Sequence, residues 1–317
     1  MIPTTLPEAF WDLALDLPDR RDGKVRVSYR LGDDQRLLIT TDRISAMDRV
    51  VGAVPYKGQV LNQLSDFWFA ATADVVANHV VSVPDPNVMV VRAAQPLPVE
   101  VVVRGYLTGV TSTSMWTRYA AGAREIDGYR LADGLNKNSS LPTPLITPTT
   151  KAHDGGHDEP ISVAGVVERG LVDTEIWEQV CEVALALFAR GTEIAAAAGV
   201  ILVDTKYEFG LDAEGALMLI DEVHTPDSSR LWVAATYTER IAAGLEPEGL
   251  DKEDVRRAVM AHHDDATGGR AALPDEVVRA AVDRYLDAFE RLTGTEFAAG
   301  EYPVGPRIER AIAQLGE

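Results

Sequence analysis

The chain has 317 residues, of which 46% are hydrophobic and 25% charged, so it is long enough for one large or two to three smaller globular domains. Its formal net charge of −19, with no long basic run, argues against binding to nucleic acid or to anionic membrane surfaces. The single cysteine, Cys181, excludes an intrachain disulfide and a zinc site built from several cysteines.

The sequence shows no targeting or membrane-spanning segment. The first five residues lack the basic-then-apolar order of a signal peptide, and the longest apolar run, residues 194–203, is about half the ~20 residues that a membrane span needs. We therefore expect a cytoplasmic protein without a membrane or nucleic-acid partner.

The first third of the chain is predicted to be rich in strands. A helix is predicted over residues 60–71. Strands are predicted over residues 25–30, 36–41, 79–83, 88–92 and 98–104.

The predicted secondary structure changes twice along the rest of the chain. Residues 128–162 are predicted to be loop-rich because they contain several prolines and a glycine pair. A helix is predicted over residues 173–198, and from residue 238 onward the pattern is helical, ending in an amphipathic stretch at 274–293. Strands are predicted over residues 200–209 and 216–223. These shifts predict three domains: a β-rich lobe (1–105), an α+β lobe with a hairpin (106–235) and a helical segment (236–317).

Lysine usage points to phosphate chemistry. Only six of the thirty basic side chains are lysine, and the others are arginine. Four of these lysines lie in turn-rich or strand-edge segments beside polar groups: Lys24, Lys57, Lys151 and Lys206. A compact ammonium group on a flexible stem suits a phosphoryl group that moves. The alternative is an ordinary solvated lysine at each position, but four together in an arginine-rich chain favour a phosphate site.

The strongest local pattern is a strand with charged residues two apart. These residues are Asp204, Lys206 and Glu208, which share one face because side chains alternate along a strand. A two-residue turn at 214–215 would place Asp221 opposite Glu208. The two carboxylates would repel each other without a cation between them, and Mg²⁺ bridging nucleotide phosphates prefers such ligands. The alternative is an exposed charged face on which Lys206 neutralises both acids.

Residues 147–159 combine polar side chains with two glycines, which let the backbone approach a ligand closely. Three interpretations remain open: a zinc site through His153 and His157, a flexible surface loop, or a loop that closes over substrate and brings Lys151 to a phosphate. The glycines oppose the helix that would place both histidines on one face, which disfavours zinc.

Two arginines at strand ends, Arg104 and Arg230, lie near small hydroxyl and glycine residues and could bind a phosphate with two hydrogen bonds. The sequence contains no P-loop string, no Rossmann fingerprint and no G-x-S-x-G elbow. The residues by themselves therefore predict an enzyme that handles phosphate and metal and contains an antiparallel sheet.

Several sequence blocks, in the same order, resemble the SAICAR synthetase family, whose full name is phosphoribosylaminoimidazole-succinocarboxamide synthase. The resemblance spans roughly residues 20–255, and residues 244–247 are similar to the longer plant-like and bacterial form. It implies an α+β fold of two lobes with antiparallel sheets, a nucleotide site between the lobes as in protein kinases, and a helical C-terminal part. The blocks are Gly23-Lys24-Val25-Arg26, Thr41-Asp42-Arg43-Ile44-Ser45-Ala46, residues 55–62, 102–109 and 147–151 with His157-Asp158, and residues 204–210 and 221–230.

The resemblance also implies a reaction in de novo purine biosynthesis. ATP phosphorylates the carboxylate of carboxyaminoimidazole ribotide, the amine of L-aspartate attacks the acyl phosphate, and phosphate leaves, so the products are SAICAR, ADP and phosphate. A carboxylate is a poor electrophile until its oxygen becomes a phosphate leaving group, which requires positive charge around the transferring phosphoryl. The expected cofactors are ATP and Mg²⁺, and the expected state is a monomer or homodimer.

Site residues follow from the resemblance position by position. Those implied for the nucleotide are Lys24, Arg26, Gln95, Leu97, Glu208 and Asp221, of which Glu208 and Asp221 would also bind magnesium. Those implied for the ribotide are Arg104, Thr111, Ser112, Asp227, Ser229 and Arg230. Those implied at the reacting centre are Lys151, Asp158, Asp204 and Lys206.

Two positions depart from the family pattern. Val27 stands where many relatives have Asp, and Val110 stands where the family usually has a Ser that helps to bind the ribotide phosphate. Because valine cannot donate a hydrogen bond, either Thr111 or Ser112 compensates or the substrate differs. The alternatives are a paralogue that amidates a related azole carboxylate in specialised nucleoside synthesis, a small-molecule kinase, and a nucleotide sensor without catalysis.

Overall fold

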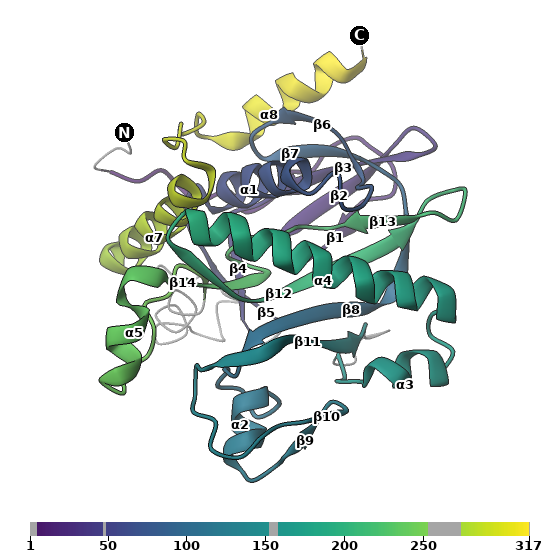
Figure 1. Cartoon of the computed structure of the whole chain (residues 1–317). Coiled ribbons are helices and arrows are strands. Elements are labelled where there is room, and N and C mark those ends of the chain that lie inside the picture. Colours follow the sequence, from purple (N-terminus) through teal and green to yellow (C-terminus); the bar gives the residue numbers. More distant parts are fainter. Residues whose placement is uncertain (1–4, 47–48, 152–157, 253–273, 317) are drawn as a thin grey trace.

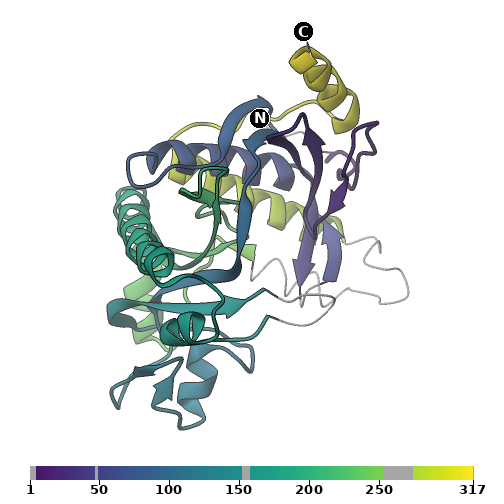
Figure 2. The same cartoon turned by 90° about the vertical axis from the view of Figure 1, so that its right-hand side faces the viewer.

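The computed structural model describes residues 5–46, 49–151, 158–252 and 274–316. Two five-stranded antiparallel sheets and several helices build the molecule (Figures 1 and 2). The predicted α+β class with antiparallel sheets is confirmed. Within the described ranges, no helix has the length and apolar character that crossing a membrane requires.

The first sheet has the strand order β1-β2-β3-β7-β6. Alternation gives it two buried faces: one packs against the N-terminal segment and α8 (Val304–Ala313), and the other against α1 (Lys57–Ala71). The four strands predicted in this region are present within a few residues of their expected bounds. The strands are β1 (Arg21–Asp22), β2 (Arg26–Leu31), β3 (Gln35–Thr40), β6 (Val80–Asp85) and β7 (Val88–Arg92).

Helix α1 lies in the main hydrophobic core, against α7 (Asp275–Thr293) and the first sheet. It begins three residues before the predicted helix, because Lys57 and Gly58 form its first turn. Gly58 allows a close approach here, since a Cβ atom would lie 2.5 Å from the carbonyl oxygen of Thr40. The predicted apolar face of α7 is confirmed, with Ala281, Tyr285 and Phe289 buried among others.

The second sheet has the order β11-β8-β12-β13, and β14 also pairs with β12. Two residues separate the end of β7 from the start of strand β8, which leads the chain from one sheet to the other (Figure 1). The division into three domains at residues 105 and 235 stays a prediction. The strands are β8 (Gln95–Tyr106), β11 (Ser140–Thr150), β12 (Val200–Leu211), β13 (Leu217–Ile220) and β14 (Ser229–Val233).

The prediction that residues 128–162 are loop-rich is wrong in part, because β11 is an 11-residue strand. Its three prolines, Pro142, Pro144 and Pro148, obscured the pattern. Proline lacks a backbone donor, but β8 is the one named strand that pairs with β11 in the described sheet, and the register is irregular between Ser140 and Leu145, so missing donors are tolerated there.

Helices and short strands complete the fold. Helix α4 (Thr174–Ala197) runs along β12 and covers one face of the second sheet (Figure 1), and it begins after Asp173, whose carboxylate accepts a hydrogen bond from the amide of Glu175. A separate small core lies around Leu107, Met115 and Ile126. The remaining elements are β4 (Arg43–Ala46), β5 (Arg49–Ala53), α2 (Met115–Ala120), β9 (Glu125–Ile126), β10 (Tyr129–Arg130), α3 (Val163–Glu168), α5 (Ala234–Ala242) and a 3₁₀ turn at Gln314–Gly316.

Candidate active site

Strand β12 provides the centre of the site. Asp204, Lys206 and Glu208 lie on one face of it, as predicted, while Tyr207 between them is fully buried in the core on the other face. Apolar residues 200–203 and α4 hold this strand inside the second sheet. The strand therefore presents three charged side chains on a rigid and well-buried backbone.

Asp204 lies between two arginines from the neighbouring strands. In the sheet register it stands opposite Arg104 on β8 and opposite Arg230 on β14. Nη1 of Arg104 donates to Oδ2 of Asp204 at 3.0 Å, and Nη1 of Arg230 donates to the same oxygen. Nε of Arg104 also donates to the hydroxyl of Thr147 at 2.8 Å. The carboxylate thus orients both guanidinium groups toward one side of the sheet.

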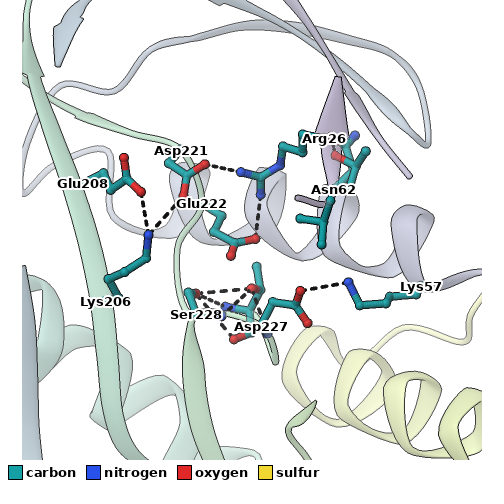
Figure 3. Close-up of polar contacts among 12 residues, drawn as sticks. Arg26, Lys57, Asn62, Lys206, Glu208, Asp221, Glu222, Asp227 and Ser228 are labelled. Atoms are coloured by element: carbon teal, nitrogen blue, oxygen red, sulfur yellow. Dashed lines mark hydrogen bonds and ion pairs between the residues drawn. The ribbon is translucent and has the colours of Figure 1, made fainter. Parts of the chain in front are cut away.

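Lys206 lies among carboxylates (Figure 3). Its ammonium donates to Glu208 at 2.5 Å and to Glu100 at 2.9 Å, and its nitrogen lies 3.9 Å from Asp221. A second ammonium, that of Lys151, donates to the other oxygen of Glu208 at 2.5 Å. Two of the predicted phosphate-site lysines therefore meet at one carboxylate.

The predicted register of the hairpin is wrong by one residue. Glu208 stands opposite Ile220, and not opposite Asp221. The reason is the loop, which has three residues between Asp212 and Ala216, with Gly215 at φ 83° in the left-handed region. A one-residue shift normally turns a side chain to the other face of the sheet.

The carboxylate of Asp221 nevertheless lies on the same side as Glu208, because the backbone bends after β13. Asp221 directly follows β13 in the left-handed conformation, with φ 68°, which turns its carboxylate toward the site (Figure 3). There it accepts a hydrogen bond from Nη1 of Arg26, whose Nη2 donates to Glu222 at 2.6 Å. The two predicted metal ligands are brought together by a bend in the backbone, and not by pairing across the hairpin.

The pKa values reflect this crowding of charge. Burial would raise the pKa of Glu208, but the charges and hydrogen bonds of Lys206 and Lys151 outweigh it and hold the pKa well below its usual value. Burial raises the pKa of Asp221 to about 6 and outweighs the lowering effect of Arg26 and Lys206, while the charges of Glu208 and Glu222 add to the rise. Burial would lower the pKa of Lys206, yet the surrounding carboxylates raise it well above normal.

A cavity of about 450 Å³ lies where the two sheets face each other. Lys24 and Arg26 line it from the first sheet and its loop, whereas Glu208 and Asp221 line it from the second sheet and its hairpin. Six carboxylates and four basic side chains line this cavity, so its walls carry an excess of negative charge. Its lining also includes Ser45, Glu100, Asp158, Lys206, Glu222, Asp227 and Lys252.

A second cavity of about 280 Å³ contains the two arginines. Arg104, Arg230 and Thr111 line it, and Asp204 forms part of its wall. Asp158 and Lys206 line both this cavity and the 450 Å³ cavity, so the two spaces meet at these residues. The arrangement places an arginine-rich compartment beside a carboxylate- and lysine-rich one.

The other predicted site residues lie further away. Gln95 and Leu97 stand at the start of β8, and neither lines the two cavities. Ser112 is exposed and lines neither cavity, while Ser229 is buried and its hydroxyl donates to Thr205 at 2.8 Å. The predicted histidines His153 and His157 lie outside the described residues.

Val110, the position that departs from the family pattern, is 60% exposed. It lines a third cavity of about 220 Å³ on another side of Arg230, beside Trp232 and Lys137, and does not line the cavity that contains Arg104. Thr111 lies in the arginine cavity and is thus the better placed of the two proposed substitutes for a serine at position 110.

The comparison with known protein families shows to which family this chain belongs. Residues 19–271 match SAICAR synthetase. The chain belongs to the SAICAR synthetase family.

Relatives and solved structures of this family match nearly the whole chain. The chain is 49% identical to a putative phosphoribosylaminoimidazole-succinocarboxamide synthase 2 from Mesorhizobium japonicum, over 92% of this chain and 93% of that protein. It is 47% identical to the synthase from Legionella pneumophila (strain Lens), over 98% of each chain. The structure of the SAICAR synthase from Saccharomyces cerevisiae complexed with SAICAR is 32% identical and superimposes with a TM-score of 0.77, covering 92% of this chain and all of that one.

Sequence reasoning missed several residues of the candidate site. Glu100 contacts Lys206, Glu222 contacts Arg26, and Asp127 lines the arginine cavity. Glu100 could have been found, because it lies four residues before Arg104 and so on the same face of a predicted strand. Asp127 lies in the β9–β10 turn, where only tertiary structure brings it near Arg104.

The carboxylates present fit the donor chemistry of magnesium. Mg²⁺ is usually held by one or two carboxylates together with phosphate oxygens and water, and Glu208 and Asp221 both line the 450 Å³ cavity. Within the described ranges, no cluster of three or more potential metal-ligating side chains occurs. With Glu208 and Asp221 as protein ligands, magnesium here would take its other ligands from nucleotide phosphates and water.

Proposed function

We propose that this chain is an ATP-dependent ligase that joins L-aspartate to 5-amino-1-(5-phosphoribosyl)imidazole-4-carboxylate, the carboxyaminoimidazole ribotide, to give SAICAR, ADP and phosphate in de novo purine biosynthesis. Membership of the SAICAR synthetase family and 47–49% identity to synthases over nearly the whole chain support this function. The observation that carries it is the junction of two unlike cavities at Lys206 and Asp158.

The junction fits a transfer between two phosphate-containing substrates. Arg104 and Arg230, held by Asp204, offer paired donors for the ribotide phosphate, and Thr111 lies in the same cavity. The ribotide carboxylate would then lie near Lys206. Ser112 and Ser229 would contribute to this side only indirectly, since the first is exposed and the second is bonded to Thr205.

The nucleotide belongs in the cavity between the sheets. Lys24 and Arg26 line it from the first sheet and are placed to contact the polyphosphate, and Gln95 and Leu97 lie on the strand that connects the two sheets, where adenine would bind. Glu208 and Asp221 would hold Mg²⁺, which when bound supplies positive charge to the polyphosphate. Because the cavity walls carry an excess of carboxylates, a polyanionic nucleotide needs that cation to enter.

Lysines neutralise the transferring group. As the γ-phosphoryl of ATP moves to the ribotide carboxylate, negative charge builds up between the two cavities, both of which Lys206 lines. Lys151 contacts Glu208 on the wall of the larger cavity and is the second ammonium near the transferring group. The amine of aspartate then attacks the acyl carbon, the bond to the phosphate oxygen breaks, and inorganic phosphate leaves. Asp158, at the same junction, is placed to accept the proton that the amine loses.

A single assay tests the proposal. Purified protein is given ATP, Mg²⁺, L-aspartate and carboxyaminoimidazole ribotide, and both ADP and SAICAR are measured while one component at a time is omitted. We expect ADP and SAICAR in equal amounts and only when all components are present. ADP released without aspartate, together with a stable phosphorylated product, would identify a kinase instead. Turnover of another azole carboxylate and not of the ribotide would identify the paralogue function.

A further inference from the structure

Asp227 lines the cavity between the sheets, yet its carboxylate is already occupied by protein donors. Nζ of Lys57 donates to Oδ2 of Asp227 at 2.8 Å, and the hydroxyl of Tyr285 donates to Oδ1 at 3.1 Å. Lys57 is fully buried, and Tyr285 nearly so. A carboxylate with both oxygens engaged by buried donors is an anchor within the protein rather than a free acceptor for substrate.

The three partners come from distant parts of the chain. Lys57 is the first residue of α1, Tyr285 lies in α7, and Asp227 lies in the turn between β13 and β14. The ammonium of Lys57 also lies 5.7 Å from the centre of the Tyr285 ring, within range of a cation–π contact. Figure 3 shows Lys57 approaching Asp227 beside the carboxylates of the site.

The turn that contains Asp227 supports the functional groups. The hydroxyl of Thr225 accepts from the amides of Asp227 and Ser228, at 3.2 and 3.3 Å, which fixes the turn locally. The carbonyl of Ser228 accepts from the amide of Lys206 at 2.9 Å. Arg230 follows two residues later and reaches Asp204. Any movement of Asp227 is therefore transmitted to Arg230 and to the backbone of Lys206.

We propose that Tyr285 and Lys57 are positioning residues that clamp Asp227, so that α7 sets the placement of Arg230 for the ribotide phosphate. The clamp rests on the proposed function, and it gives Asp227 a positioning role in place of the predicted direct contact with substrate. Tyr285 itself contacts no substrate, because its hydroxyl is used on Asp227 inside the core.

The test is the Tyr285→Phe variant in the ribotide assay. This change removes only the hydroxyl that holds Oδ1 of Asp227, so the turn loosens while the packing of α7 is kept. We expect the KM for ribotide to rise about threefold to tenfold and kcat to change less than about twofold, as for loss of one hydrogen bond to a charged group. Simple destabilisation would lower the active fraction and hence kcat, and would leave KM unchanged.

Tyr29→Phe is the matched control. It also removes a buried hydroxyl, which donates to the carbonyl of Leu13 at 2.7 Å in the other core of the first sheet, away from both cavities. We expect its KM and kcat to equal those of the wild type. A ribotide KM that rises equally in Tyr29→Phe and Tyr285→Phe would overturn the clamp.

A double-mutant cycle gives an independent reading. In an Asp227→Ala background both acceptor oxygens of the clamp are removed, so Tyr285→Phe should add less than about a twofold further change in KM. Fully multiplicative effects, or an unchanged KM in Tyr285→Phe when the wild type turns over ribotide, would overturn the positioning role alone. Absence of ribotide turnover by the wild type would overturn the proposed function and the clamp together.

Discussion

At the scale of single residues, the site is governed by how a smaller number of cations is shared among a larger number of carboxylates. Lys206 lies between Glu208 and Asp221, where the sequence predicts a cation, and its ammonium group forms ion pairs with both predicted metal ligands. The lysine of the charged-face alternative and the carboxylates of the magnesium interpretation therefore belong to one cluster. We expect the phosphates of a nucleotide to compete with these carboxylates for Lys206.

Glu208→Gln and Asp221→Asn should each weaken use of magnesium and nucleotide. Each change removes one negative charge next to Lys206 while keeping the size of the side chain, so we expect turnover at about 1 mM Mg²⁺ to fall on the order of 100-fold and to recover partly at high Mg²⁺. The measurement is turnover against Mg²⁺ concentration. Glu214→Gln, in the exposed hairpin loop, is the control and should behave as wild type. Normal magnesium dependence in both site variants would disprove the metal assignment.

Lys151→Ala should lower kcat far more than it raises the KM for ribotide. Its ammonium contacts Glu208, and it matters most when charge gathers on the transferring phosphoryl, so we expect kcat to fall about 100-fold or more. Lys151→Arg keeps the charge and should recover part of the rate. An unchanged kcat with a raised ribotide KM would show that Lys151 only binds substrate.

At the scale of elements, the bend after β13 is as important as the hairpin itself. Asp221 and His224 both have positive φ, 68° and 47°, although neither is glycine. The buried ring of His224 fixes the bend in the core. The centre of this ring lies 4.6 Å from the centre of the Trp68 ring, and its Nε2 lies 2.5 Å from the hydroxyl oxygen of Tyr207. Helix α4 makes room for this ring only because residue 191 is glycine.

Gly191→Ala should therefore destabilise the protein, although alanine is the better helix former by about 1 kcal/mol. A Cβ atom at this position would lie 2.2 Å from Cε1 of His224, and the buried ring cannot move away. We expect the free energy of unfolding, measured in urea, to fall by about 2 kcal/mol net.

Ala186→Gly, at an exposed position of the same helix, is the control. It should cost about 1 kcal/mol, which calibrates helix propensity alone. If Gly191→Ala were more stable than the wild type, the close packing of α4 against His224 would be refuted.

At the scale of the whole molecule, folding also buries ionisable groups that line neither cavity, and these shape its acid stability. His79 is buried next to Phe69, and burial, with the charges of Arg26 and Arg92, lowers its pKa to about 3 from an ordinary value of 6.5. Below pH 6.5 the unfolded chain binds a proton on His79 that the folded protein does not bind. His79 therefore weakens the folded state as the pH falls from about 6.5 toward 3.

His79→Phe should remove this penalty. We expect the difference in unfolding free energy between the variant and the wild type to be constant above about pH 7.5. Below pH 6.5 it should shift in favour of the variant by about 1.4 kcal/mol per pH unit. The difference is the quantity to measure, because Asp42 and Asp221, whose pKa values are raised to about 6, act in the opposite direction in both proteins. A pH-independent difference would show that His79 titrates normally.

The sequence by itself determined which residues could do chemistry and on which face of β12 they lie. A strand alternates with a fixed period, so Asp204, Lys206 and Glu208 had to share a face wherever the strand was placed. Alternation also predicted most of the strands, and the helical period of apolar residues predicted the amphipathic α7. The family resemblance rested on the same kind of local pattern, since blocks of neighbouring residues identify a family without a fold.

Only the tertiary structure decided which of those residues meet. The hairpin register depended on a three-residue loop with a left-handed glycine, and one residue of loop length changes every cross-strand partner. The β11 strand depended on its place at the sheet edge, where prolines are tolerated. Lys57, Asp227 and Tyr285 lie up to 228 positions apart, and their contact follows from packing α1 and α7 into one core, which no local pattern encodes.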